Sequence, residues 1–222
     1  MAWRRLAVIL FVTTLASPGA AADFRLLRLG GQVVKWGEPV LGAGAALTWS
    51  FAQRRHEFPD AINCRVVTPL TGLFQAAGIE PSEAEALFTR SFRQWETAAN
   101  LSFRYVENED AADILIGAQG EPTGIAFANV WHEPRSGAAI APLTRASICL
   151  NPMLRWEKAA DGNSDTYEIN HVAAHEIGHA IGLDHPGPAG ALMGYQYNEG
   201  DGELRSGDVA GAVTLYGVRA AD

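Results

Sequence analysis

Basic residues and cysteine are scarce in this 222-residue chain. It has 17 lysines and arginines against 25 aspartates and glutamates, so its formal net charge is −8. An acidic surface argues against nucleic acid or anionic membranes as partners. Internal repeats and low-complexity tracts are also missing. A hydrophobic content of 48% with 19% charged residues is typical of one globular domain, or of two subdomains around a shared cleft.

Long hydrophobic runs are absent except near the start. The basic MAWRR, the largely apolar LAVILFVTTLA and the small residues SPGAAA predict a secretory signal peptide over residues 1–22, cut after Ala22. The run is too short to cross a bilayer, so a membrane anchor is the weaker interpretation. We therefore expect a secreted protein, extracellular or periplasmic, with a formal charge of −10 after cleavage.

Only two cysteines occur, Cys64 and Cys149. In an oxidising compartment an even number of cysteines favours one disulfide, and two buried free thiols are the alternative.

The rest of the chain predicts a mixed α/β pattern. Alternating or continuous apolar residues indicate strands, at 46–51, 101–106, 112–117, 124–131 and 146–150. Between the first two strands, residues 52–81 contain several prolines and glycines, so a long irregular insertion is expected there.

Two long helices and one short helix are expected. Ser82 with Glu85 forms a capping box before the first helix, and Asp165 with Glu168 opens the second. A short helix at 207–217 has Ser206 as its predicted N-cap.

The second helix carries the stretch AAHEIGHAIGLDHPG, residues 173–187. His175 and His179 are separated by four residues, so both imidazoles lie on one helical face and can bind one ion. Glu176 is rotated by about 100° around the helix axis, where it can reach a water without binding the metal. Gly182 allows the sharp turn that brings His185 back as a third ligand. Three protein ligands leave one zinc position open, as catalysis requires.

The alternative is a helix that merely happens to carry histidines. A bare HExxH occurs by chance, but the extended pattern also fixes Gly182 and His185, which a chance helix has no reason to provide. His171 lies one turn before His175 and is interpreted as a neighbouring residue rather than a ligand.

This stretch, HEIGHAIGLDH, resembles the HExxHxxGxxH signature of the metzincin zinc endopeptidases. Metzincins also place a methionine-containing turn beneath the zinc, and ALMGY at 191–195 supplies it with Met193. The short spacing from His185 to Met193, the strand ADILIG and the terminal GDVAGAVTLYG resemble the matrixin branch. The resemblance covers 46–51 and 82–217 well and the insertion at 52–81 poorly.

The resemblance implies an α/β (α+β) metzincin-like fold. Its twisted mixed sheet would have about five strands, with two long helices and an active-site helix lining a cleft. After a short N-terminal segment over 23–45, the catalytic domain would cover 46–222. Its upper subdomain would reach to about residue 182, and a small helix-poor lower subdomain would cover 183–222.

The resemblance also implies the reaction, zinc-assisted hydrolysis of peptide bonds in proteins or peptides. One catalytic zinc would be held by the three histidines, with Glu176 as general base. Tyr195 is either a stabiliser of the developing oxyanion or a turn residue on the cleft wall. Met193 and Gly182 would support the site. The substrate would pair with the strand around Ala126, Phe127 and Ala128.

Several departures from the family matter. Pro186 after His185, and Tyr195 two residues after Met193, are serralysin-like features, yet no calcium-binding repeats follow. Whether the protein also binds structural calcium cannot be derived from the sequence. Matrixins hold a second, structural zinc through histidines that align with Phe127 and Cys149 here, so no second zinc is expected. A disulfide from Cys64 to Cys149 would replace it. No prodomain with a cysteine switch is apparent before residue 46.

Two other functions compete with this interpretation, a catalytically silent binding protein with the same fold and a periplasmic zinc-binding protein. The intact His175, Glu176, His179 and His185 argue against the first. Only three of the six histidines are in register, which argues against a storage protein. A monomer is expected.

Overall fold

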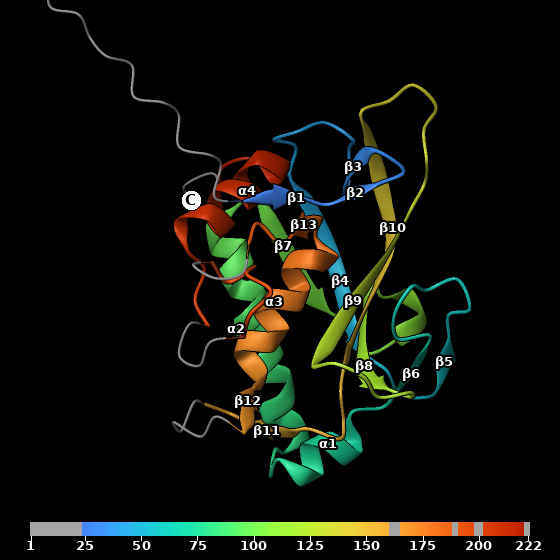
Figure 1. Ribbon diagram of the computed structural model, residues 1–222, viewed down its shortest axis with the longest axis vertical. Helices are drawn as coiled ribbons and strands as arrows, with labels where there is room; N and C mark the ends of the chain where they lie inside the picture. Colours follow the sequence, from blue (N-terminus) through green and yellow to red (C-terminus); the bar gives the residue numbers. More distant parts are fainter. Residues whose placement is uncertain (1–23, 160–164, 188–190, 198–201, 220–222) are drawn as a thin grey trace, which may run out of the picture.

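The computed structural model describes residues 24–159, 165–187, 191–197 and 202–219. The expected signal peptide over residues 1–22 lies outside the described residues. Within those ranges the chain has a mixed α+β fold, with two long helices beside one twisted mixed sheet (Figure 1). The expected fold class is confirmed.

The main sheet follows the order β2-β3-β10-β8-β4-β7, and β9, β6 and β5 join it through β10 and β8. The bounds are β2 Arg28–Leu29, β3 Gln32–Lys35, β4 Ala45–Phe51, β5 His56–Glu57, β6 Val66–Thr68, β7 Leu101–Tyr105, β8 Ile114–Gln119, β9 Ala126–His132 and β10 Ile140–Leu150. From β3 to β7 the strands of this order are parallel, whereas β2 is antiparallel to β3 and β9 is antiparallel to β10. All five expected strands are present, but the short strands β2, β3, β5 and β6 bring the sheet to nine strands instead of about five.

Two short strand pairs and the helices complete the chain. The pairs are β1 (Arg25–Leu26) with β13 (Leu183–Asp184), and β11 (Arg155–Glu157) with β12 (Thr166–Glu168). The helices are α1 Thr71–Ala76, α2 Pro81–Ala98, α3 Ile169–Ala180 and α4 Ser206–Tyr216, with a 3-10 turn, η1, at Glu109–Ala111.

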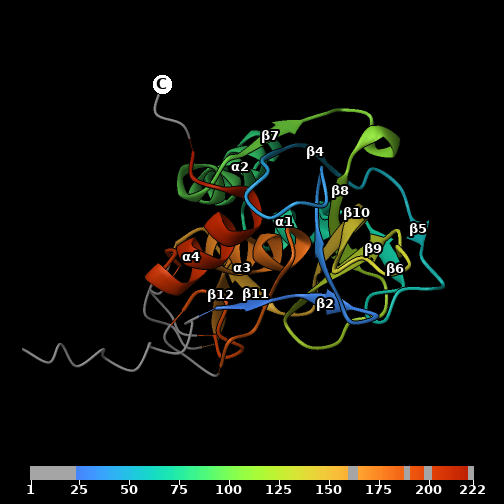
Figure 2. The ribbon, with the colours of Figure 1, turned by 90° about the horizontal axis from the view of Figure 1, so that it is seen from above.

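Both faces of the central strands are buried, against two different hydrophobic clusters. Ile114 and Ile116 of β8 point into the larger cluster, which α2 and α3 cover (Figure 2). Leu115 points the other way, into a smaller cluster with Phe58 and Cys149. Successive side chains of a strand alternate between faces, so a continuous apolar strand is the expected pattern for a sheet covered on both sides.

Buried polar contacts fix the two long helices to each other. The Trp95 indole N–H donates to the carbonyl oxygen of Ala174 at 2.9 Å, and the Ser91 hydroxyl donates to that of Asn170 at 3.0 Å. Both α2 side chains are fully buried. Each satisfied hydrogen bond avoids the cost of an unpaired buried group, so these contacts define how α3 lies against α2.

The helix starts differ from the predicted ones. Helix α2 begins at Pro81 with Glu80 as N-cap, because proline fits the first helical position and the Glu80 N–H donates to Glu83 at 3.0 Å. The predicted box of Ser82 with Glu85 is therefore wrong. Asp165 does not open α3 either.

Helix α3 starts later than predicted because residues 166–168 form β12, which makes Glu168 the N-cap. In α4 the N-cap is Arg205 rather than Ser206.

The insertion at 52–81 is more regular than expected. It contains β5, β6 and α1, and β6 pairs with β8 of the main sheet. Its cluster residues between Ala52 and Val67 cover the face of the sheet opposite α2 and α3, whereas Leu70, Leu73 and Ile79 belong to the larger cluster on the side of those helices. The prediction of a wholly irregular insertion is wrong, because strands of two or three residues leave no readable pattern.

The N-terminal segment at 23–45 contains β1, β2 and β3. Strand β3 pairs in parallel with β10, and β1 pairs with β13 beside the end of α3. The Leu27 N–H donates to the carbonyl oxygen of Gly182 at 2.8 Å. The segment thus packs directly against the helix that carries the histidines.

Candidate metal centre

A cleft of about 530 Å³ lies between α3 and the edge strand β9. One wall is formed by residues 124–128 with Val130, and the floor by α3. The segment 194–197, Leu27 and Asn63 also line the cleft. Strand β9 is bonded to β10 alone, so its other edge faces this cleft.

Three histidines converge in this cleft. The Nε2 atom of His185 lies 3.1 Å from Nε2 of His175 and 3.0 Å from Nε2 of His179. Among the described residues, they are the one group of three or more His, Cys, Asp or Glu side chains whose ligand atoms lie within 4.8 Å of one another. The i, i+4 spacing on α3 places the first two side by side, as expected.

Gly182 turns the chain so that His185 returns to α3. Its φ is +101°, a conformation that favours glycine. A Cβ atom here would also collide with the carbonyl oxygen of Val34 in β3. The turn and the close approach of β3 therefore both require glycine at this position.

Backbone carbonyls define which ring nitrogens of the histidines carry protons. Nδ1 of His175 lies 2.7 Å from the oxygen of Leu192, and Nδ1 of His179 lies 2.9 Å from that of Leu183. A carbonyl can only accept, so both Nδ1 atoms are protonated and both Nε2 lone pairs point into the cleft. Lone pairs facing one another at this distance repel unless a cation lies between them. The residues fit a metal ion.

Burial favours the neutral form of these rings. It lowers the pKa of His175 to about 4 and that of His179 to about 3, and it lowers the pKa of His185 as well. Metal ligands must be deprotonated, so the site is ready to bind at neutral pH without displacing protons.

Glu176 lies beside the three histidines but is not part of their cluster. Its side chain is buried and lines the cleft, and the Ala128 N–H of β9 donates to its carboxyl group. Its Oε2 has no hydrogen-bond partner among the described residues. Burial raises the pKa of Glu176 to about 8. A cation held by the histidines would lower this pKa again.

Met193 packs beneath the histidines. A Cβ atom added at Gly178 would collide with the Met193 sulfur, so the glycine inside HEIGH allows the methionine to approach α3. Met193 is buried, and its N–H donates to Asp208 of α4 at 3.0 Å. Sequence reasoning missed both Gly178 and Asp208.

Asp208 is a buried carboxylate that accepts three backbone N–H groups. These belong to Leu192 and Arg205, both at 2.8 Å, and to Met193. From the sequence, its position two residues after Ser206 indicates only that it belongs to the first turn of a helix. Its contact with the methionine turn depends on tertiary structure.

Tyr195 lines the cleft on the side of the methionine turn. It is 61% exposed, and its ring centroid lies 6.2 Å from that of His185. The side chain is therefore at the rim of the cleft, near the third histidine.

Ala126, Phe127 and Ala128 all line the cleft. The carbonyl oxygen of Ile125 accepts from Asn151 next to β10, so backbone groups at odd positions of β9 face β10. Alternation along the strand then turns those of Ala126 and Ala128 towards the cleft.

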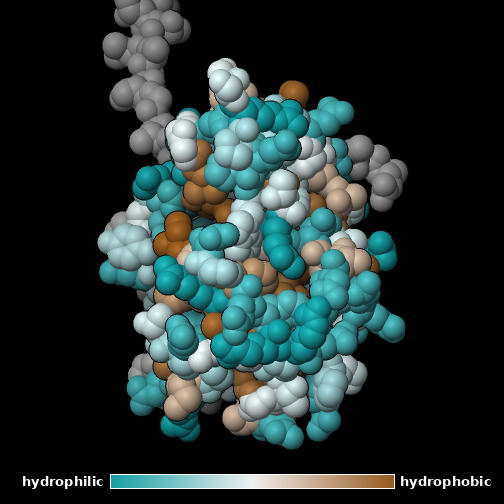
Figure 3. All heavy atoms as spheres, turned by 90° about the vertical axis from the view of Figure 1, so that its right-hand side faces the viewer, coloured by the Kyte–Doolittle hydropathy of each residue, from teal (hydrophilic) through white to brown (hydrophobic). Residues whose placement is uncertain are grey.

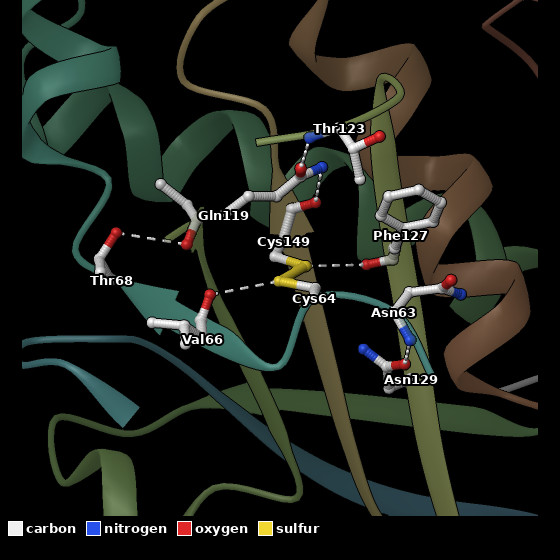
Figure 4. The surroundings of a disulfide bond; sticks show 10 residues. Asn63, Cys64, Val66, Thr68, Gln119, Thr123, Phe127, Asn129 and Cys149 are labelled. Atoms are coloured by element: carbon white, nitrogen blue, oxygen red, sulfur yellow. Dashed lines mark hydrogen bonds between the residues drawn. A yellow bond between two sulfur atoms is a disulfide. The ribbon is translucent and has the colours of Figure 1, made fainter. Parts of the chain in front are cut away.

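Cys64 and Cys149 are joined by a disulfide that links the insertion to β10 (Figure 4). Phe127 lies directly opposite Cys149 in the pairing of β9 with β10. The two positions that hold structural-zinc histidines in the resemblance are therefore neighbours here, and one of them belongs to the disulfide.

Comparison with known proteins identifies the family. The matrixin family model matches residues 73–217. The chain belongs to the matrixin family. Membership implies a catalytic zinc, and the converging histidines fit it.

Three relatives illustrate the range of similarity. The chain is 31% identical to the hatching enzyme of Paracentrotus lividus over 67% of its own length and 25% of the relative's. It is 30% identical to human matrix metalloproteinase-19 over 63% of the chain and 27% of the relative. It is 28% identical to serralysin B of Dickeya chrysanthemi over 76% and 30%. The chain thus spans between 25% and 30% of the length of these relatives.

No helix among the described residues is long and apolar enough to cross a membrane.

Proposed function

We propose that this matrixin is a secreted zinc-dependent endopeptidase. The observation that carries the proposal is the convergence of three imidazole Nε2 atoms beside a buried glutamate, in a cleft bounded by an edge strand. His175, His179 and His185 would hold one zinc. Bound there, zinc would act as a Lewis acid and would lower the pKa of a water so that it can be deprotonated to a nucleophile at neutral pH.

Glu176 is the general base in this proposal. Its unpaired Oε2 in the cleft can accept a proton from the attacking water. The same carboxyl group then donates that proton to the leaving amine, so it returns to its starting state. The hydrogen bond from the Ala128 N–H holds the carboxyl group next to the substrate strand.

The substrate is a protein or peptide that binds in an extended conformation along β9. The backbone groups of Ala126 and the carbonyl oxygen of Ala128 on its free edge would pair with the peptide, as in strand addition. Phe127 lies between them in sequence, with its own backbone groups turned towards β10. The hydrogen bond from Ala128 to Glu176 couples substrate position to the base.

Tyr195 stabilises the transition state in this proposal. Its exposed side chain near His185 can move towards the reacting carbonyl and donate a hydrogen bond to the developing oxyanion. Met193 and Gly182 support the site without touching the substrate: one packs beneath α3, and the other shapes the turn to His185.

The proposal also covers where the protein is located, how its chain is divided and how many zinc ions it binds. Residues 1–22 act as a signal peptide, and a disulfide suits an oxidising compartment outside the cytosol. We place the catalytic domain over the remaining chain, with the 23–45 segment packed against it. The mature protein is a monomer with one zinc and no second structural zinc.

Zinc analysis of the mature chain, combined with a casein cleavage assay, tests this function. Wild type should contain one zinc and cleave casein. Glu176→Ala should keep the zinc and lose cleavage, because Glu176 is not a ligand. Zinc without cleavage in wild type would favour a silent binding protein or a zinc-binding protein, and an active Glu176→Ala would refute the mechanism.

A further inference from the structure

The loop 58–65, within the insertion at 52–81, ends at the cleft. Asn63 lines the cleft together with residues of β9, although it comes from a part of the chain far from the histidines in sequence. Its N–H donates to the Asn129 side-chain oxygen at 3.1 Å (Figure 4). The loop is thereby bonded directly to the strand that we propose binds substrate.

Several contacts fix the 58–65 loop from within. The Phe58 N–H donates to the carbonyl oxygen of Arg65 at 2.7 Å, which closes its base. The Ala61 N–H donates back to Phe58 at 3.0 Å, and the Arg65 side chain donates to Ala61 at 3.1 Å. Side chains of Phe58 and Ala61 are buried in the smaller hydrophobic cluster. The loop is thus a closed unit with a buried base.

The disulfide holds this unit against the sheet. Cys64 follows Asn63 directly, and its bond to Cys149 connects the loop to β10, next to β9. Cys149 is fully buried and Cys64 almost so. Asn63 therefore stands between two attachments, its own hydrogen bond to Asn129 and the disulfide of the next residue.

Ile62 is the exposed apolar residue of the loop. It is 83% exposed, although its neighbours Ala61 and Cys64 are buried. The face of the molecule that carries β5 and β6 is mostly hydrophilic, with only small hydrophobic areas (Figure 3). Ile62 does not itself line the cleft, but it directly precedes Asn63, which does, so a peptide that extends past Asn63 can reach it.

We propose that the 58–65 loop is one wall of the substrate site, in which Asn63 contacts the peptide along β9 and Ile62 selects an apolar side chain. A peptide added to β9 points alternate side chains to opposite faces of the sheet. One set faces α3. The other set points the same way as Phe127 and Trp131, which pack against the smaller cluster beneath the loop. The proposal rests on the proposed peptidase function.

Cleavage-site profiling on a casein peptide mixture tests this wall. Wild type should prefer aliphatic or aromatic residues at one substrate position. Ile62→Ser should reduce that preference about fivefold, because the contact is only partly removed from water. Val218→Ser is the matched control, since Val218 is 75% exposed and, unlike Ile62, has no neighbour in sequence that lines the cleft. An unchanged profile in Ile62→Ser overturns the proposal while the peptidase function stands.

A second measurement does not depend on turnover. In the zinc-loaded Glu176→Ala protein, the same peptide mixture should shift the methyl NMR signals of Ile62 together with the amide signal of Ala128. A shift at Ala128 without one at Ile62 would overturn the proposed role of the 58–65 loop, while the proposed pairing of the peptide with β9 would stand. No shift at either residue overturns both the wall and the proposed function.

Discussion

The Nδ1–H of His175 donates to the carbonyl oxygen of Leu192 at 2.7 Å. The N–H of Leu192 in turn donates to the buried carboxylate of Asp208 at 2.8 Å. A histidine of the proposed metal site is therefore oriented by a carboxylate that lies on another helix and does not line the cleft. Such outer contacts fix the tautomer and the ring orientation of a ligand.

Asp208→Asn should weaken both folding and zinc binding. One of the accepted N–H groups would face an amide NH₂ instead of an oxygen, so the free energy of unfolding should fall by about 2 to 3 kcal/mol. Zinc affinity should fall about 10- to 100-fold, the usual range for an outer contact of a ligand. Urea denaturation of the zinc-free protein and competition with a chelator measure the two effects.

Asp110→Asn is the control for that change, because Asp110 is an exposed carboxylate of η1 far from the histidines in sequence. It should leave both quantities close to wild type. If Asp208→Asn loses stability but keeps wild-type zinc affinity, Asp208 supports only α4 and the methionine turn.

His179→Ala should abolish stabilisation by zinc. A ligand that binds only the folded state stabilises it by about 2.7 kcal/mol at 100 times its Kd, which corresponds to a rise in Tm of roughly 6 to 10 °C for a chain of this size. Wild type should show this rise on zinc addition in a thermal melt, and His179→Ala should show none. His132→Ala should behave like wild type, since His132 lies outside the group of converging histidines. A full zinc-dependent rise in His179→Ala would exclude it as a ligand.

The ligand spacing could be predicted from sequence because helix geometry alone sets it. Residues four apart on a helix, such as His175 and His179, lie on the same face, and Gly182 marks the turn to His185. The contact from Asp208 to Leu192 could not be predicted. The two residues are 16 positions apart, one in α4 and the other in the methionine turn, so only the tertiary structure brings them together. No local pattern records such a contact.

The position of Asn63 at the cleft could not be predicted from the sequence either. The insertion at 52–81 has strands of two or three residues, too short for alternation to appear. Its fold depends on the link from Cys64 to Cys149 and on packing against Leu115. Likewise β1 and β13 have two residues each, so their pairing beside His185 left no signal.

The stability of the metal-free protein should pass through a maximum near pH 6.5 to 7. His175 and His179 have a folded pKa of about 4 and about 3, below the ordinary value of 6.5. The unfolded state therefore binds more protons below pH 6.5, and stability is lost as the pH falls from there. Burial holds the folded pKa of Glu176 at about 8, above its ordinary 4.5, so its contribution is present below pH 4.5 and is lost as the pH rises to 8.

Between pH 4.5 and 6.5 the two histidines raise the free energy of unfolding with pH more than the one glutamate lowers it. Between pH 6.5 and 8 only the glutamate changes it, so stability falls. Each group changes the free energy of unfolding by up to about 1.4 kcal/mol per pH unit. Urea denaturation of chelator-treated protein at pH 5, 6.5 and 8.5 measures the curve. Glu176→Gln should remove the alkaline decline and keep the acidic one. A wild-type stability that still rises from pH 6.5 to 8.5 would contradict the assignment to Glu176.

The disulfide should account for a large part of the stability of the insertion. It joins residues 85 apart in sequence, and loop-closure models assign such a bridge roughly 4 kcal/mol. The double variant Cys64→Ala/Cys149→Ala should lose about that much free energy of unfolding in urea. Wild type treated with a reductant in the same assay is the matched control, because it loses the bond without losing the sulfur atoms. A double variant as stable as oxidised wild type would show that the buried cluster holds the insertion without the bond.

The same bond bears on the number of metal ions. In the matrixin resemblance the positions of Phe127 and Cys149 carry histidines for a second zinc, whereas here one is aromatic and the other is used by the disulfide. A closed structural zinc site needs four nitrogen, sulfur or oxygen ligands. We therefore expect one zinc per native chain and no titratable thiol in denaturant without reductant. Two zincs together with two free thiols would show that Cys149 serves a metal rather than a disulfide.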